Sequence, residues 1–114
     1  MASDLPVGVT DLIQRHLHSV LDIETVLLLR SRSEVLWSPR DLATALYIAE
    51  EAAGEHLRKL HASGLLAAAG GEQPVYRYEP RDAELSMAVD QLVVTYAQRR
   101  VRVIEYLYSR PLHS

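Results

Sequence analysis

Charged side chains gather in the stretch IAEEAAGEHLRKL, residues 48–60, and could do the chemistry of nucleic-acid recognition. Arg58 and Lys59 are cations that can neutralise phosphates or donate to guanine, and a glutamate can accept from the amino group of cytosine. However, three glutamates lie between residues 50 and 55, and a polyanion such as DNA repels them. The apolar spacing of this stretch favours a helix that reads DNA, whereas its charges favour a different partner.

Catalytic and metal-binding patterns are missing from the sequence. His16 and His18 are two positions apart and His56 and His61 are five apart, whereas two ligands on one helix face need a spacing of about three or four. The chain has no cysteine, and it has no Walker loop, Rossmann glycine pattern or nucleophile elbow. We therefore predict a protein that is not an enzyme, with no catalytic residue, metal site or cofactor.

Length and composition predict one globular domain. The chain has 114 residues, 48% of them hydrophobic, and a net charge of −3. No segment is strongly basic: residues 1–37 carry 3 Lys and Arg against 5 Asp and Glu, residues 38–80 carry 4 against 6, and residues 81–114 carry 5 against 4. The N-terminus lacks the pattern of a signal peptide and no run approaches the roughly 18 apolar residues of a membrane span, so we expect a cytoplasmic protein without a membrane partner.

Helix-start and helix-stop residues place two short helices in the middle of the chain. Ser38 can cap a helix from Pro39 to about Leu46, with Asp41 three residues after the cap. A turn of about three residues leads to a second helix, from near Glu50 to about Ala62, which Gly64 would end. We expect two earlier helices, one capped by Thr10 and one beginning near Asp22.

The second half of the chain predicts a hairpin followed by one long helix. Extended segments at Leu65–Ala69 and Val75–Glu79 flank a turn at Gly70 and Gly71. Residues 82 to about 109 then read as a single helix of roughly 27 residues, about 40 Å long. The stretch VRVIEYLY is rich in β-formers, so a strand is the alternative there.

This order of elements resembles a winged helix-turn-helix domain. The resemblance is carried by LWSPRDLATALYIAEEAAGEHLRKLHASGLL and AAAGGEQPVYRYEP. These stretches are similar to those of small bacterial transcriptional regulators of the MarR and PadR kind. It implies an α+β, mostly α fold, with an N-terminal helix in residues 1–18, the winged helix-turn-helix domain in residues 19–80 and a long C-terminal helix in residues 81–114. Trp37 stands where that family has a short strand that pairs with the wing.

The resemblance also implies which residues would contact duplex DNA. The outward face of the recognition helix would comprise Glu51, Gly54, Glu55, Arg58 and Lys59. The start of the motif and the wing would add Ser38, Arg40, Gly71, Gln73 and Arg77.

The C-terminal helix predicts a homodimer, because its polar stripe is too narrow for one protomer to cover the rest. The expected dimerisation residues are Leu85, Val89, Leu92, Val93, Tyr96, Val103, Ile104 and Leu107. In the same helix Arg99, Arg100 and Arg102 form either a phosphate-binding patch or a set of arginines that extend from apolar surface into water.

Two functions remain open from the sequence. The first is a transcriptional regulator that binds double-stranded DNA as a homodimer. The second is a winged-helix module that binds a protein partner and no DNA, which the acidic residues of the recognition helix favour.

Overall fold

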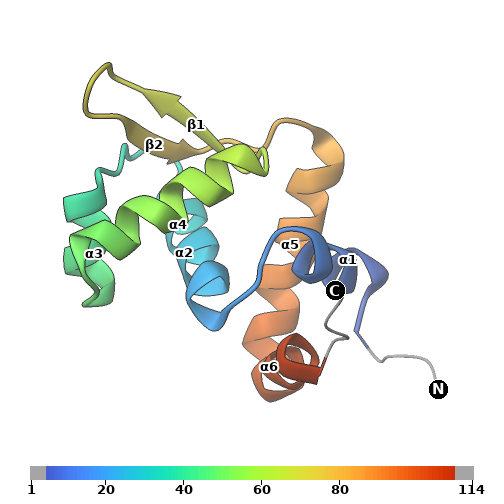
Figure 1. The fold of residues 1–114 in the computed structure, drawn as a ribbon. Coiled ribbons are helices and arrows are strands. Elements are labelled where there is room, and N and C mark those ends of the chain that lie inside the picture. Colours follow the sequence, from blue (N-terminus) through green and yellow to red (C-terminus); the bar gives the residue numbers. More distant parts are fainter. Residues whose placement is uncertain (1–4, 110–114) are drawn as a thin grey trace. The chain divides into compact units, whose positions relative to one another are not determined.

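The structure, a computed structural model, describes residues 5–109 (Figure 1). Within that range the chain forms six helices and two strands, in an order that agrees with the winged helix-turn-helix prediction. The elements are α1 (Val7–Arg15), α2 (Val20–Ser31), α3 (Pro39–Leu46), α4 (Glu50–Ala62), β1 (Leu66–Ala69), β2 (Val75–Tyr78), α5 (Ala83–Gln98) and α6 (Arg100–Ser109). None of these helices is long and apolar enough to cross a membrane.

The chain divides into two compact units, which we describe separately. The first unit comprises residues 1–23 and 82–114 and holds α1, α5 and α6; the second comprises residues 24–81 and holds α3, α4 and the β1–β2 hairpin. Helix α2 begins in the first unit and continues in the second.

In the second unit, α3 begins at the cap that the sequence predicted. The Ser38 hydroxyl accepts a hydrogen bond from the Asp41 amide at 3.1 Å, and the Asp41 carboxylate accepts one from the Ser38 amide at 3.1 Å. This reciprocal pair is a complete capping box, in which aspartate does the work of the usual glutamate or glutamine. Helices α3 and α4 therefore begin and end at the residues that the sequence predicted.

The hairpin of the second unit is a two-stranded sheet to which one further residue, Trp37, is bridged. β1 and β2 pair antiparallel, from Leu66 opposite Tyr78 to Ala69 opposite Val75. Trp37 adds a bridge on the other side of β2: its amide donates to the Tyr76 carbonyl at 2.6 Å, and the Tyr76 amide donates back at 2.8 Å. At Trp37, where a short strand was expected, the structure has a single bridge to β2, which attaches the wing to the chain just ahead of α3.

The core of the second unit is formed by apolar side chains of α3, α4 and the hairpin. Helix α4 packs against both α3 and β1. The buried side chains on these elements include Leu42, Ala53, Leu57, Leu60, Leu65, Leu66 and Tyr76. This apolar layer holds the outward side of α4 in a defined orientation.

In the first unit, α1 packs closely against α5 and also contacts α6. A Cβ atom on Gly8 would overlap only the end of the flexible Gln91 side chain and would lie 3.9 Å from the Ala88 backbone of α5. α1 begins at Val7, and the Thr10 hydroxyl donates within the helix to the Val7 carbonyl at 3.1 Å. The expectation that Thr10 caps this helix was therefore wrong, because the helix begins one turn earlier.

The prediction of one continuous helix after residue 82 was also wrong. α5 ends at Gln98, Arg99 adopts φ −137° and ψ 47°, and α6 begins at Arg100. The segment holds no proline or glycine, so the break has no local sequence signal. It lets α6 take its own direction and contact α1, where the Gln14 side-chain amide donates to the Tyr106 hydroxyl at 2.7 Å. VRVIEYLY is helical, so the strand alternative is excluded.

Candidate nucleic-acid interface

The outward side of α4 carries four of the five predicted recognition residues. Glu51, Glu55, Arg58 and Lys59 are all exposed. Arg58 makes no ion pair or side-chain hydrogen bond with any residue in the described range. Its guanidinium reaches back along the helix, with Nη1 3.4 Å from the position that a Cβ on Gly54 would occupy. α4 therefore presents a cation that no residue in the described part of the chain engages.

Gly54 does not belong to that outward surface. It is buried, and a Cβ placed on it would lie 3.7 Å from the Pro39 side chain. The predicted DNA contact from Gly54 is therefore corrected: this glycine lies at the contact between α4 and the first residue of α3. The sequence could not show that Gly54 is covered, because the residue that approaches it, Pro39, belongs to another helix.

The first turns of α3 and α4 are joined by a long ion pair. Arg40 Nε lies 3.9 Å from Glu50 Oε1, and both side chains are largely exposed. A pair of this kind contributes little to stability, because water and salt screen it. Ser38, predicted as a contact at the motif start, is half-buried and its hydroxyl is committed to the capping box. Of these two predicted contacts, Arg40 is the one that solvent reaches freely.

The wing presents its turn residues to solvent. Gly70 has φ +85°, a conformation that glycine adopts without strain, and Gly71 has open space around it. Gln73 is exposed beside them. Arg77 is exposed on β2, but its guanidinium donates to the Glu79 carboxylate at 2.9 Å. The wing thus offers backbone and amide groups together with a partly neutralised cation.

Tyr47, in the turn between α3 and α4, is a surface residue that sequence reasoning missed. It ends α3 in the left-handed conformation, with φ 58° and ψ 46°, and its side chain is 94% exposed. Glycine or asparagine is the usual residue in that conformation, so the tyrosine gives no sequence signal of the turn. It stands three residues before the first residue of α4.

The predicted dimerisation residues divide into two groups in the structure. Four of them are buried in the protomer: Val89, Leu92, Val103 and Leu107. The other four are half-buried: Leu85, Val93, Tyr96 and Ile104. The buried four cannot face a second copy, and the expectation that they do so is corrected. They are covered because, after the break at Arg99, both α5 and α6 pack against α1.

A different set of apolar residues is exposed on these two helices. Met87 and Val94 on α5 are 64% and 54% exposed, and Val101 and Tyr108 on α6 are 70% and 73% exposed. Successive members are seven residues apart, so the two on each helix lie on one side of it. This heptad spacing was a sequence signal that could have identified them. We refer to Met87, Val94, Val101 and Tyr108 as the heptad residues.

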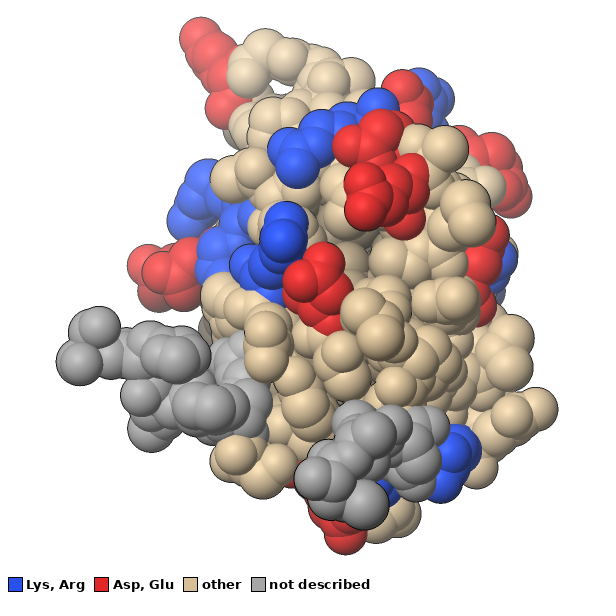
Figure 2. All heavy atoms as spheres, turned by 90° about the vertical axis from the view of Figure 1, so that its right-hand side faces the viewer, with Lys and Arg blue, Asp and Glu red and all other residues tan. Residues whose placement is uncertain are grey.

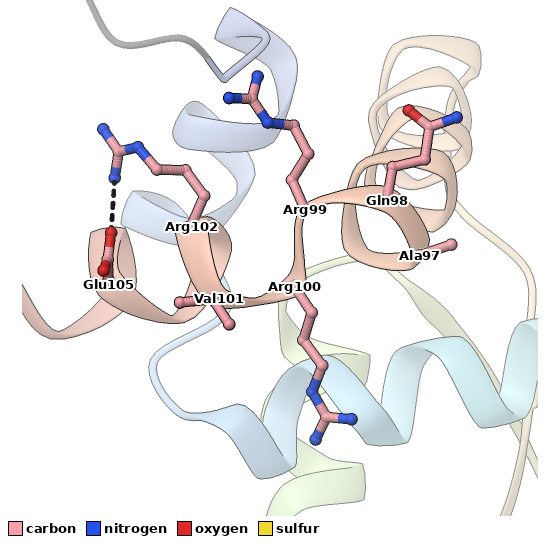
Figure 3. Close-up of a pocket in the computed structure, with 7 residues that line it drawn as sticks. All are labelled: Ala97, Gln98, Arg99, Arg100, Val101, Arg102 and Glu105. Atoms are coloured by element: carbon pink, nitrogen blue, oxygen red, sulfur yellow. Dashed lines mark ion pairs between the residues drawn. The ribbon is translucent and has the colours of Figure 1, made fainter.

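Three arginines surround an open pocket of about 470 Å³ at the break between α5 and α6 (Figure 3). Arg99 and Arg100 point to opposite sides of the chain. Arg100 lies over the Tyr96 ring at 5.3 Å, and Arg102 lies 3.8 Å from Glu105. The three guanidiniums therefore do not converge on one point. Of the two interpretations of these arginines, the structure favours side chains that extend from apolar surface into water, and it does not favour a phosphate-binding patch.

Charges of both signs intermingle on the face of the molecule drawn in Figure 2. Figure 2 shows lysine and arginine next to aspartate and glutamate on the face that it draws, without a broad field of one sign. In the part of the chain that the structure describes, no group of three histidine, aspartate or glutamate residues could hold a metal ion. On the face drawn in Figure 2, a polyanion would therefore meet individual cations and no continuous basic field.

Comparison with known proteins bears on the fold. No family model matches the sequence, and no curated protein matches it. The chain is similar to the crystal structure of Rv1404 from Mycobacterium tuberculosis, with a TM-score of 0.60 and 14% identity over 86% of this chain; it spans 65% of the length of that chain. The adhesin competence repressor AdcR from Streptococcus pyogenes gives a TM-score of 0.48 and 16% identity, covering 80% of this chain and 72% of that one.

At such identities the similarity concerns the fold. The α3–turn–α4 pair, the β1–β2 wing and the bridge from Trp37 to the wing supply the defining parts of that fold within this chain. The protein is thus a mostly α, α+β protein with the winged helix-turn-helix fold.

Proposed function

We propose that the protein is a transcriptional regulator that binds duplex DNA as a homodimer, with α4 in the major groove and the wing against the neighbouring backbone. The observation that carries the proposal is the uncommitted Arg58, exposed on the second helix of a helix-turn-helix pair. Arginine at such a position can donate two hydrogen bonds to guanine or neutralise a phosphate. Leu57 and Leu60, buried on the opposite side of α4, keep Arg58 facing outward.

The start of α4 supports a contact with the DNA backbone. Ala49 precedes the helix and supplies no side-chain hydrogen bond to its first turn. The first amide groups of a helix have no partner within the helix and are common ligands for phosphate. Arg40 and the wing residues Gly71 and Gln73 are exposed and could add further backbone contacts.

A homodimer would compensate for the mixed charge of each recognition surface. Glu51 and Glu55 lie beside Arg58, so a single copy should bind DNA weakly. Two linked copies gain avidity without new contacts, and a two-fold dimer would present two recognition helices to half-sites about 34–36 Å apart. The heptad residues on α5 and α6 are the exposed apolar side chains suited to such an interface, with Val93 and Ile104 half-buried on the same helices.

The first experiment is fluorescence anisotropy with labelled duplexes from upstream of the protein's own gene and with random duplexes, across a salt series. We expect tighter binding to the upstream duplexes and a linear fall of log K with log salt. Arg58→Ala should either weaken specific binding by about 1–3 kcal/mol, if it contacts a base, or reduce the salt slope by about one, if it contacts a phosphate.

Arg15→Ala is the matched control for Arg58→Ala. Arg15 is an exposed arginine on α1 that pairs with Asp11 at 3.0 Å, so its removal subtracts the same charge from an element outside the α3–α4 motif. Its binding and salt slope should stay at the wild-type values. Absence of binding by the wild type at low salt would overturn the proposal, and light scattering that shows a monomer at micromolar concentration would overturn its homodimer part.

A second candidate function is a protein-interaction module that binds no DNA. The exposed Glu51 and Glu55 favour it, because they make the N-terminal half of α4 acidic. If this candidate holds, the wild type binds no duplex at low salt, whereas the double variant Glu51→Lys with Glu55→Lys acquires duplex affinity. If the wild type already binds specifically, the second candidate is wrong.

A further inference from the structure

Tyr47 occupies a backbone conformation that its side chain opposes. The turn between α3 and α4 requires φ 58° at this position, and the Tyr47 amide donates to the Ala43 carbonyl to close α3. Ile48 donates to the same carbonyl at 3.1 Å. Glycine adopts this conformation without a steric penalty, whereas a residue with a Cβ atom raises the free energy of the folded state.

No contact of the Tyr47 side chain within the described residues offsets the free-energy cost of this conformation. The Tyr47 side chain is 94% exposed, so it buries almost no apolar surface. Within residues 5–109 its hydroxyl makes no hydrogen bond, and its ring contacts no aromatic ring or cation. A large aromatic side chain held in solvent at a strained turn indicates a partner outside the chain.

The position of Tyr47 indicates the chemistry of that partner. It stands beside the first turn of α4, where Glu50 and Glu51 are acidic and the Arg40 guanidinium lies 3.9 Å from Glu50. A phosphate that approaches the turn between α3 and α4 needs a hydrogen-bond donor other than Arg40, because Glu50 partly neutralises Arg40. A tyrosine hydroxyl is such a donor, and its ring can pack against a sugar.

We propose that Tyr47 contacts the DNA backbone, with its hydroxyl donating a hydrogen bond to a phosphate oxygen. This inference rests on the proposed function, because it requires that α4 approaches duplex DNA. A hydroxyl carries no charge, so the contact releases no counterion and has the same strength on every sequence. Those two properties separate Tyr47 from Arg58.

The test compares Tyr47→Phe and Tyr47→Gly with the wild type by fluorescence anisotropy, on upstream and random duplexes across a salt series. We expect Tyr47→Phe to bind both duplexes about three- to tenfold more weakly with an unchanged salt slope, since one hydrogen bond and no cation is lost. Tyr47→Gly should bind at least as weakly and should raise the thermal midpoint of unfolding, since it relieves the strained turn. Ser33→Ala, which removes an exposed hydroxyl outside α3, α4 and the wing, should match the wild type.

Each other outcome has a definite meaning. If the wild type binds and both Tyr47 variants bind equally well, this inference is overturned while the proposed function stands. If Tyr47→Gly weakens binding but Tyr47→Phe does not, the contact is apolar and the hydrogen bond to phosphate is wrong. If Tyr47→Gly lowers the thermal midpoint, the side chain stabilises the fold and the argument from strain fails. If the wild type binds no duplex at low salt, the proposed function and this inference fall together.

Discussion

The outward side of α4 and the outward sides of α5 and α6 differ in chemistry. α4 exposes the charged residues Glu51, Glu55, Arg58 and Lys59, whereas α5 and α6 expose the apolar heptad residues. Salt screens contacts between exposed charges, but it does not weaken the burial of apolar surface. The two surfaces should therefore respond differently to salt: DNA binding through α4 weakens as salt rises, whereas self-association through the heptad residues persists. The two proposed interactions, DNA binding and self-association, can thus be distinguished by how each responds to salt.

The largest effect is expected from a residue that the sequence assigned to the dimer surface and the structure buries. Leu92→Ala should lower the free energy of unfolding by about 2–5 kcal/mol, because Leu92 is fully buried and its truncation leaves a cavity. Val94→Ala, two residues away and 54% exposed, should change the monomer's stability by less than about 0.5 kcal/mol. Urea denaturation of both variants, at one protein concentration low enough to keep them monomeric, checks the difference. Equal losses would mean that the buried and exposed sides of α5 have been misassigned.

The second prediction concerns the apolar surface directly. Val94→Glu combined with Val101→Glu should weaken dimerisation at least about tenfold, because burying an unpaired carboxylate in the interface removes its water at a cost in free energy. Sedimentation equilibrium measures the dissociation constant. Thr44→Glu adds the same kind of charge on the exposed side of α3 and serves as the control, which should dimerise like the wild type. A double variant that still dimerises normally would remove the heptad residues from the interface.

A smaller effect is expected at the start of the recognition motif. Ser38→Ala should lower the free energy of unfolding by about 1 kcal/mol, since the Asp41 amide loses its hydrogen-bond acceptor. Ser38→Asn, which retains a capping oxygen, should recover most of the loss. Thermal and urea unfolding give the stabilities, and anisotropy gives the DNA affinity at a temperature where both variants are folded. If Ser38→Ala weakens DNA binding more than it weakens the fold, Ser38 has a contact role in addition to its cap.

The smallest effect has the opposite sign. Gly54→Ala should raise the free energy of unfolding by roughly 0.5–1 kcal/mol, because alanine is the better helix former. The added Cβ would meet only ordinary contacts with Pro39 and with the movable end of Arg58. DNA affinity should stay within about twofold of the wild type, since Gly54 is buried. A stabilised variant with a large loss of affinity would show that α4 needs the bare backbone at Gly54 and would restore it to the binding surface.

Much of the second unit was predictable because its signals act over a few residues. Ser38, Pro39 and Asp41 define the start of α3 through contacts within one turn, and Gly64, with φ +86°, ends α4 as expected. The hairpin was predicted to within one residue at each strand, because Gly70 supplies the turn between two short extended runs. Tyr47 escaped prediction because a tyrosine in the left-handed conformation is forced by the packing of α3 against α4 and has no local preference for it.

The candidate interface was predictable only where exposure follows from helix periodicity. Glu51, Glu55, Arg58 and Lys59 lie outward as the spacing indicated, but Gly54 is covered by the approach of Pro39 from another helix. The same limit applied to α5 and α6, where a polar stripe counted along one straight helix assigned four core residues to the surface.

The sequence by itself determined the order of the elements, the caps and bounds of α3 and α4, the wing and the shortage of basic charge. These follow from short-range hydrogen bonds, backbone preferences and composition, which do not depend on distant neighbours. Only the tertiary structure decided the break at Arg99, the burial of Gly54, Leu92 and Val103, and the exposed strained conformation of Tyr47. The physical reason is that a helix direction and a side chain's burial are set by whichever element packs against them, and that neighbour lies elsewhere in the chain.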